Sequence, residues 1–334
     1  MIPSGRELTP PAPTVPPESA SGYSGGVTAW ISCGAPPGDP VRELVVDEAG
    51  RLVARSLSGR FASTDQGVSW TALAAEPASP PPPPTTELDA GPSEHLATVR
   101  DGESRWSLVR HHGMSSYEAP GDRGMPITHW ATRVSTFLDG TVDGGATATR
   151  VECPGATALA LDRSGRLWLA SNQGVDVADA RQVATGGATW RRALDRAVTA
   201  IVVDLDGRVV AGAGDTALLS IDGVAFTAIP PRATDRGSWG SLDCDARGFT
   251  LLTCAPDGRI WAVVGGVGGP HHIVRLSDAV AGGKPRWEAL ALGLNVIAGR
   301  GLRDGHLAVT ALALTGDGTA FAATRSHGLF RRPP

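Results

Sequence analysis

The feature that most constrains the fold of this chain is an internal repeat. The sequence contains six copies of one unit, in which a short apolar run, a tight turn with a glycine and a second apolar run follow one another. Two β-rich runs joined by such a turn predict an antiparallel hairpin. The stretches between the copies lack sustained helical periodicity, so we expect few helices. The copies occupy residues 42–56, 95–110, 156–171, 198–213, 249–264 and 309–324.

Most hairpins are followed by a third short run and then by a fourth that carries a tryptophan, as in 61–73. Four-stranded units repeated around a ring predict an all-β fold, a six-bladed β-propeller. The last unit lacks its fourth run, and residues 26–33, "GVTAWISC", supply one. We therefore expect an N-terminal strand to complete the last blade and close the ring, which removes exposed sheet edges. A seven-bladed ring is the alternative, since residues 131–155 have room for further strands.

Two proline-rich stretches lie outside the predicted strands. Residues 1–24 are polar and proline-rich, which predicts a disordered tail before a single propeller over 25–334. The loop at 76–94, "EPASPPPPPTTELDAGPSE", joins the first blade to the second. Its proline run favours an extended polyproline II conformation, which can dock into the groove of a partner protein. A stiff spacer is the simpler interpretation of the same residues.

One turn has a more specific pattern, "STDQGVSW" at residues 63–70. Asp65 can accept hydrogen bonds from its own turn, Gly67 permits a positive φ, and Trp70 supplies area for packing between blades. With Ser63, these residues form a pattern that resembles the Asp-box, or BNR repeat, of sialidase-like propellers. The resemblance implies a fold and a structural role for the four residues. It implies no activity, because Asp-boxes occur in enzymes, lectins and scaffolds.

Several functional classes find no support in the sequence. The resemblance to sialidases implies an Arg-Ile-Pro motif and a tyrosine nucleophile, but the motif is absent and there are only two tyrosines. There is no serine elbow and no glycine loop that opens a helix. The four cysteines form no CxxC pair, so we expect no zinc knuckle. A net charge of −4 does not favour nucleic acid, and no apolar run is long enough to span a bilayer.

The histidines give the clearest indication of a binding face. In a propeller, the loops between second and third strands lie on the same side as the connections between blades, and all histidines except His129 map to that side. We expect these loops to carry His111, His112, His271, His272 and His327, together with Arg55, Asn172, Asp215 and Arg325. Trp239 lies outside the repeat pattern, so it is a candidate ligand contact. The predicted binding residues on this face are Arg55, His111, His112, Asn172, Asp215, Trp239, His271, His272, Arg325 and His327.

Two functional predictions follow from this face. The first is a non-enzymatic binding or scaffold module without a cofactor, which recognises a protein partner or a small ligand. The second is a hydrolase or lyase that uses a divalent metal ion, with His111, His112, His271 and His272 as ligands. We expect a monomer without nucleic-acid or membrane partners. Because the N-terminus lacks a basic start followed by an apolar run, we also expect a cytoplasmic location.

Overall fold

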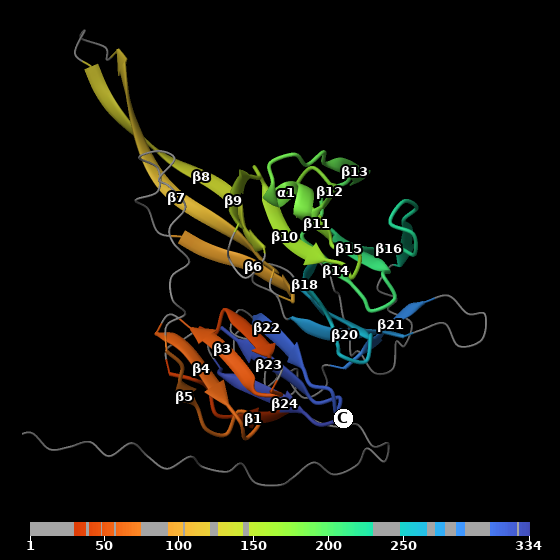
Figure 1. The fold of residues 1–334 in the computed structure, drawn as a ribbon. Coiled ribbons are helices and arrows are strands. Elements are labelled where there is room, and N and C mark those ends of the chain that lie inside the picture. Colours follow the sequence, from red (N-terminus) through yellow and green to blue (C-terminus); the bar gives the residue numbers. More distant parts are fainter. Residues whose placement is uncertain are drawn as a thin grey trace, which may run out of the picture.

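The protein is a six-bladed β-propeller (Figure 1). The computed structural model describes residues 30–37, 40–47, 49–56, 58–74, 93–102, 104–120, 126–142, 147–229, 248–265, 271–277, 285–290, 308–325 and 327–334, and the side chains of 101, 114–133 and 289 are not described. These residues form six antiparallel sheets of four strands each. Residues 131–155, where an additional blade had room, hold strands of the second sheet, so the six-bladed prediction is confirmed and the seven-bladed alternative is wrong.

The blades follow one another along the chain. Blade 1 contains β2 (Glu43–Val46), β3 (Leu52–Ser56), β4 (Gly59–Ser63) and β5 (Thr71–Ala72). Blade 2 contains β6 (Ser93–Asp101), β7 (Ser104–Pro120), β8 (Pro126–Val142) and β9 (Thr147–Glu152). Blade 3 contains β10 (Ala156–Leu161), β11 (Arg166–Ser171), β12 (Val175–Asp179) and β13 (Arg191–Leu194), with the helix α1 (Ala180–Ala184) before the last strand.

The remaining blades have the same order. Blade 4 contains β14 (Ala200–Val203), β15 (Val209–Ala213), β16 (Thr216–Ser220) and β17 (Thr227–Ile229). Blade 5 contains β18 (Phe249–Cys254), β19 (Ile260–Val264), β20 (His272–Ser277) and β21 (Arg286–Ala289). Blade 6 contains β22 (Val309–Leu314), β23 (Ala320–Thr324), β24 (Leu329–Arg332) and, as its outer strand, β1 (Ile31–Cys33).

The first described strand completes the last blade, as the sequence predicts. β1 pairs antiparallel with β24, and Cys33 lies opposite Leu329. Trp30, only 5% exposed, packs in the apolar cluster between blades 5 and 6. Its indole Nε1 donates a hydrogen bond to the carbonyl of Leu290, which follows the outer strand of blade 5, at 2.7 Å. The closing strand is therefore attached to two blades rather than one.

The hairpin turns explain why the repeat carries an aspartate before its glycine. In blade 3, the buried carboxylate of Asp162 accepts hydrogen bonds from the backbone N–H groups of Ser164 and Arg166, each at 2.9 Å. It also accepts bonds from the Arg166 guanidinium and from the indole of Trp168, at 2.7 and 3.0 Å. Gly165 adopts a φ of 78°, which a residue with a side chain rarely reaches. Local chemistry therefore determines this turn.

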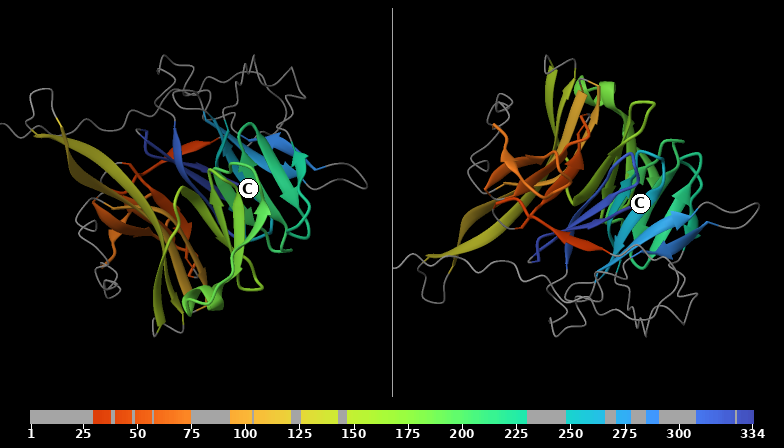
Figure 2. Two further views of the ribbon diagram at one scale, coloured as in Figure 1. Left: turned by 90° about the horizontal axis from the view of Figure 1, so that it is seen from above. Right: turned by 90° about the horizontal axis from the view of Figure 1, so that it is seen from below.

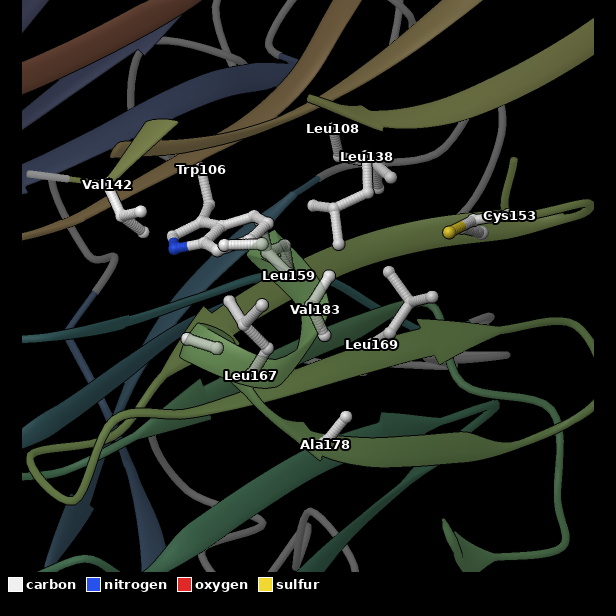
Figure 3. Packing of buried hydrophobic residues seen from close by; sticks show 13 residues of the cluster. Trp106, Leu108, Leu138, Val142, Cys153, Leu159, Leu167, Leu169, Ala178 and Val183 are labelled. Atoms are coloured by element: carbon white, nitrogen blue, oxygen red, sulfur yellow. The ribbon is translucent and has the colours of Figure 1, made fainter. Parts of the chain in front are cut away.

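Apolar clusters hold neighbouring blades together. Among the described residues, buried clusters join blades 2 and 3, 3 and 4, 4 and 5, 5 and 6, and 6 and 1. In the cluster between blades 2 and 3, Trp106, Leu108 and Leu138 pack against Leu159 and Leu167 (Figure 3). The described residues form no such cluster between blades 1 and 2, at the sixth junction of the ring.

Two strands of blade 2 extend far beyond the rest of their sheet (Figure 1). β7 and β8 have 17 residues each, whereas β6 pairs with β7 only as far as His111 and β9 pairs with β8 only from Phe137 onward. Past these points, His112–Pro120 and Pro126–Val134 pair with each other and with no third strand of the described residues. Figure 2 shows this extension, in yellow, reaching past the other sheets. We call it the arm.

Several predictions lie outside the described residues. These are the tail at 1–24, most of the proline-rich loop at 76–94, and Trp239; residues 93 and 94 of that loop begin β6. No helix in the described part of the chain has the length and apolar character needed to cross a membrane.

Candidate functional site

The arm rises from the face on which the second-to-third-strand turns lie. In every blade the four strands follow the same order and run in alternating directions. The turns between second and third strands therefore share one face, which we call the arm face. Asn172 lies in the β11–β12 turn, Asp215 in the β15–β16 turn, and Arg325 and His327 in the β23–β24 turn. Asn172, Asp215 and Arg325 are exposed there, and His327 is half-buried.

Backbone hydrogen bonds fix these turns against the blades. The N–H of Asn172 donates to the carbonyl of Gly155 at 3.3 Å, and that of Arg325 donates to the carbonyl of Ala308 at 2.9 Å. The His327 N–H donates to the hydroxyl of Thr324 at 3.1 Å. The polar side chains therefore extend from a rigid frame, as recognition surfaces require. Their role in binding remains a prediction.

The two histidines of blade 5 have structural surroundings. The Nδ1 of His271 accepts a hydrogen bond from the backbone N–H of Val309, the first residue of β22, at 3.1 Å. It thereby connects blade 5 to blade 6. His272 begins β20 and is only 4% exposed. Burial, and secondly the neighbouring His271, lower the pKa of His272 below its ordinary value, so its ring is neutral at physiological pH.

The two histidines of blade 2 were expected in a loop, and this placement is wrong because both lie in β7. Consecutive strand residues point to opposite faces of a sheet. On one face, His112 lies 3.8 Å from a carboxylate oxygen of Glu94, which Arg110 also approaches at 3.5 Å. On the other face, the ring of His111 meets that of Phe137 edge-on, with centroids 5.4 Å apart. The pair therefore does not converge on one ligand.

Arg55 was also expected in a loop, but it lies in β3, opposite Glu43 and Arg60. Leu44 and Ala54, on the other face of this sheet, pack against blade 6, so Arg55 faces blade 2. Partial burial and the positive charges of Arg55 and then Arg105 lower the pKa of His95 on β6. The fold therefore brings the predicted site residues Arg55 and His111 to the junction between blades 1 and 2.

Sequence reasoning missed most of this junction. Besides His95, it contains Arg105, Asp139 and Arg150, which lie on the same face of blade 2 as His111. The signal was present, because polar residues alternate along 95–110 where apolar ones are expected on both faces of a blade. When a sheet lies between two other sheets, polar residues at alternate positions indicate that one of its two faces meets its neighbour through polar groups.

The turn at 63–70 lies on the opposite face and holds itself together. The Ser63 hydroxyl and the Ser69 N–H both donate to Asp65 Oδ1, at 2.7 and 2.9 Å, and the Gly67 N–H donates to the Ser63 hydroxyl at 2.8 Å. The hydrogen bonds from Ser69 and Ser63 lower the pKa of Asp65 to about 2. The indole of Trp70 donates to the carbonyl of Gly34 at 2.9 Å. Membership of this turn in the Asp-box family stays a prediction.

A metal centre finds no support in the described part of the chain, where no three His, Cys, Asp or Glu side chains lie close enough to hold an ion. In the hairpin turns of blades 3 and 4, Asp162 and Asp204 are already engaged by backbone N–H groups and arginines. The metal-dependent alternative stays a prediction.

Comparisons with known proteins give the same architecture. No family model matches the sequence. No curated protein matches it either. The structure is similar to a catalytically inactive virginiamycin B lyase from Staphylococcus aureus with quinupristin, at a TM-score of 0.53 and 10% identity over 91% of this chain and 99% of that one.

Two other solved structures are similar to a comparable degree. An extracellular domain from B. thetaiotaomicron has a TM-score of 0.52 and 10% identity, over 92% of this chain and 40% of that one. A chain of the mitotic checkpoint complex has a TM-score of 0.51 and 14% identity, over 98% of each chain. The similarity is one of fold. At these identities it transfers no activity, because propellers support unrelated functions.

Proposed function

We propose that the chain is a non-enzymatic binding module whose arm and arm face contact a partner protein. The observation that carries this proposal is the arm itself, in which His112–Pro120 and Pro126–Val134 pair beyond the end of their own sheet.

The hydrogen-bonding capacity of the arm supports this proposal. A two-stranded ribbon is marginally stable in water by itself, and each of its outer edges presents a row of backbone N–H and C=O groups. Extended peptides bind to such edges by adding a strand, with affinity from main-chain hydrogen bonds. An arm of this length that projects from a rigid propeller is therefore suited to pair with, or be covered by, a partner protein.

The rest of the arm face supplies a polar surface beside the arm. Asn172, Asp215 and Arg325 are exposed on turns whose backbones are fixed. Interfaces commonly surround their central contacts with such a polar rim. The described residues offer no specific observation that favours the metal-dependent hydrolase or lyase.

The test places a photoreactive amino acid on the arm. Val134 is 53% exposed within the arm, and Val224, 64% exposed in the β16–β17 turn on the opposite face, is a matched control position. We expect position 134 to cross-link one protein that position 224 does not. That protein, purified, is then titrated into the wild-type chain and into a shortened variant.

In the shortened variant, an Asn-Gly turn replaces residues 113–133, between the register partners His112 and Val134. We expect the partner to bind this variant at least about tenfold more weakly than the wild type. Unchanged affinity of the shortened variant, or equal cross-linking from both positions, would contradict the proposal.

A further inference from the structure

The junction between blades 1 and 2 differs in chemistry from the other five. Blade 2 presents Trp106, Leu108 and Leu138 to blade 3. The strand register places a different set on its other face, where Thr98, Ser107, Asp139 and Arg150 lie side by side across the four strands. A residue and its cross-strand partners share a face, so this whole row is directed toward blade 1.

The facing side of blade 1 is also charged. Glu43, Arg55 and Arg60 are register partners across β2, β3 and β4. Val45, on the same side of the innermost strand, is 44% exposed, whereas Leu44 on the other side is buried. The side with Val45 also carries Val53 and Ala62, and the facing side of blade 2 carries Val109, all three buried. Among the described residues they form no larger apolar cluster, so polar groups make up most of this junction.

Among the residues that the structure describes, basic groups outnumber acidic ones at this junction, although the whole chain has a net charge of −4. The described charged groups that face it are Glu43, Arg55, Arg60, His95, Arg100, Arg105, His111, Asp139, Arg150 and Glu152. One carboxylate is already engaged, since the Arg150 guanidinium binds both oxygens of Asp139, at 2.7 and 3.0 Å. Arg150 also lies over the ring of Phe137, which fixes its position.

The imidazoles complete a concentration of donors. His95 keeps contact with solvent on β6 and lies within electrostatic range of Arg55, Arg105 and His111, and also of the Asp139 carboxylate that Arg150 engages. Both ring nitrogens of His111 are shielded from solvent and have no hydrogen-bond partner among the described residues. A buried N–H without an acceptor is uncommon in native proteins and is usually explained by a ligand or a water molecule.

We propose that the junction between blades 1 and 2 is a binding site for a small molecule bearing a carboxylate or phosphate group, held by Arg55, His95 and His111. Guanidinium groups bind both anions through paired N–H donors, and imidazole N–H groups add further donors. The site lies beside the base of the arm but does not depend on the arm binding a protein.

The test is calorimetric titration of the full chain with inorganic phosphate and, separately, with succinate, at constant ionic strength adjusted with chloride. We expect saturable binding of at least one of them, which also identifies the preferred anion. Arg55→Gln should weaken binding by about ten- to hundredfold, because it removes a charge-assisted contact. The matched control is Arg110→Gln, a neighbour of His111 on the same strand that faces the other way toward Glu94. It should leave the affinity within about twofold, the ordinary scatter of a surface change.

A second measurement needs no variant. Nitrogen-15 NMR of the imidazoles in the wild-type chain should show the His95 and His111 resonances shifting as the anion is added, while those of His272 stay in place. Absence of binding by both anions, equal loss in Arg55→Gln and Arg110→Gln, or saturable binding without a response of either junction imidazole would overturn the proposal.

Discussion

The attachment of the closing strand can be tested with one substitution, Trp30→Ala. The side chain of Trp30 is 5% exposed and packs with Trp261 of blade 5 and Phe330 of blade 6. Its indole also donates to the Leu290 carbonyl at 2.7 Å. Removing it should therefore loosen β1 from both blades at once.

The magnitude follows from the buried area. A buried aromatic side chain removes about 150–250 Å² from water, which at about 25 cal/mol per Å² is about 4–6 kcal/mol. Measured losses for Trp→Ala in cores are about 3–5 kcal/mol, so we expect the free energy of unfolding to fall by about 4 kcal/mol. Trp30→Phe retains most of the area and loses the indole donor, which should cost about 1–2 kcal/mol.

Trp70 offers a matched control in blade 1. It is half-buried and makes an equivalent indole bond to the Gly34 carbonyl at 2.9 Å. Because less of its area is buried, Trp70→Ala should cost about half as much, about 2 kcal/mol.

The assay is urea unfolding followed by far-ultraviolet circular dichroism, combined with hydrogen exchange of β24. In Trp30→Ala we expect faster exchange in β24, the register partner of β1, and no change in β11 of blade 3. A loss smaller than that of Trp70→Ala, or unchanged exchange in β24, would refute the reasoning.

Three further predictions concern packing and protonation. Gly140→Ala would place a Cβ 2.1 Å from a ring carbon of Trp106, so thermal unfolding should show a free energy of unfolding lower by about 3 kcal/mol. The control is Gly316→Ala, whose Cβ would have nothing within 4 Å and which should change the free energy of unfolding by less than about 0.5 kcal/mol. Burial raises the pKa of Asp162, but the hydrogen bonds of its turn outweigh burial and hold the pKa below 3.8. The ionised carboxylate therefore stabilises the fold above pH 3.8, and this stabilisation is lost as the pH falls through the lower pKa of the folded state. Acid titration of the free energy of unfolding should show this loss in the wild type and not in Asp162→Asn. Burial, and secondly His271, lower the pKa of His272 below 6.5, so the unfolded state binds the proton more tightly than the folded state. The free energy of unfolding should therefore decline as the pH falls below 6.5. If the free energy of unfolding of His272→Gln declines equally between pH 6.5 and about 5, another group is responsible.

The hairpins of the ring were predictable because their signals are local, and the closing strand was predictable because the last unit lacks its fourth run. Each hairpin carries its own apolar alternation and a turn glycine such as Gly165, whose φ of 78° fixes the reversal. The arm was not predictable in the same way. Its strand continues through "HHGMSSYEAP", which has no regular apolar alternation and resembles a loop. Backbone pairing with Pro126–Val134 forms the strand there, and such pairing is a tertiary property.

The polar junction was missed for a related reason. Arg55 and His111 were selected as site residues, but their placement in loops was wrong, and their neighbours Arg105 and Asp139 were not identified. Which neighbour a strand residue faces depends on register, and a shift of one residue sends every side chain to the opposite face. The composition of these strands was visible in the sequence, but the direction of their side chains was not.

The pairing of β1 with β24 also determines the order of events during synthesis on the ribosome. Cys33 and Leu329 are neighbours in the sheet but 296 positions apart in the chain. β1 therefore leaves the ribosome long before its partner exists, whereas blades 1 to 5 can each form from strands made in succession. Joining ends this distant costs about 5 kcal/mol of chain entropy. We therefore expect the last blade to form after translation has passed β24, and a ribosome stalled earlier to hold an open, unsealed ring.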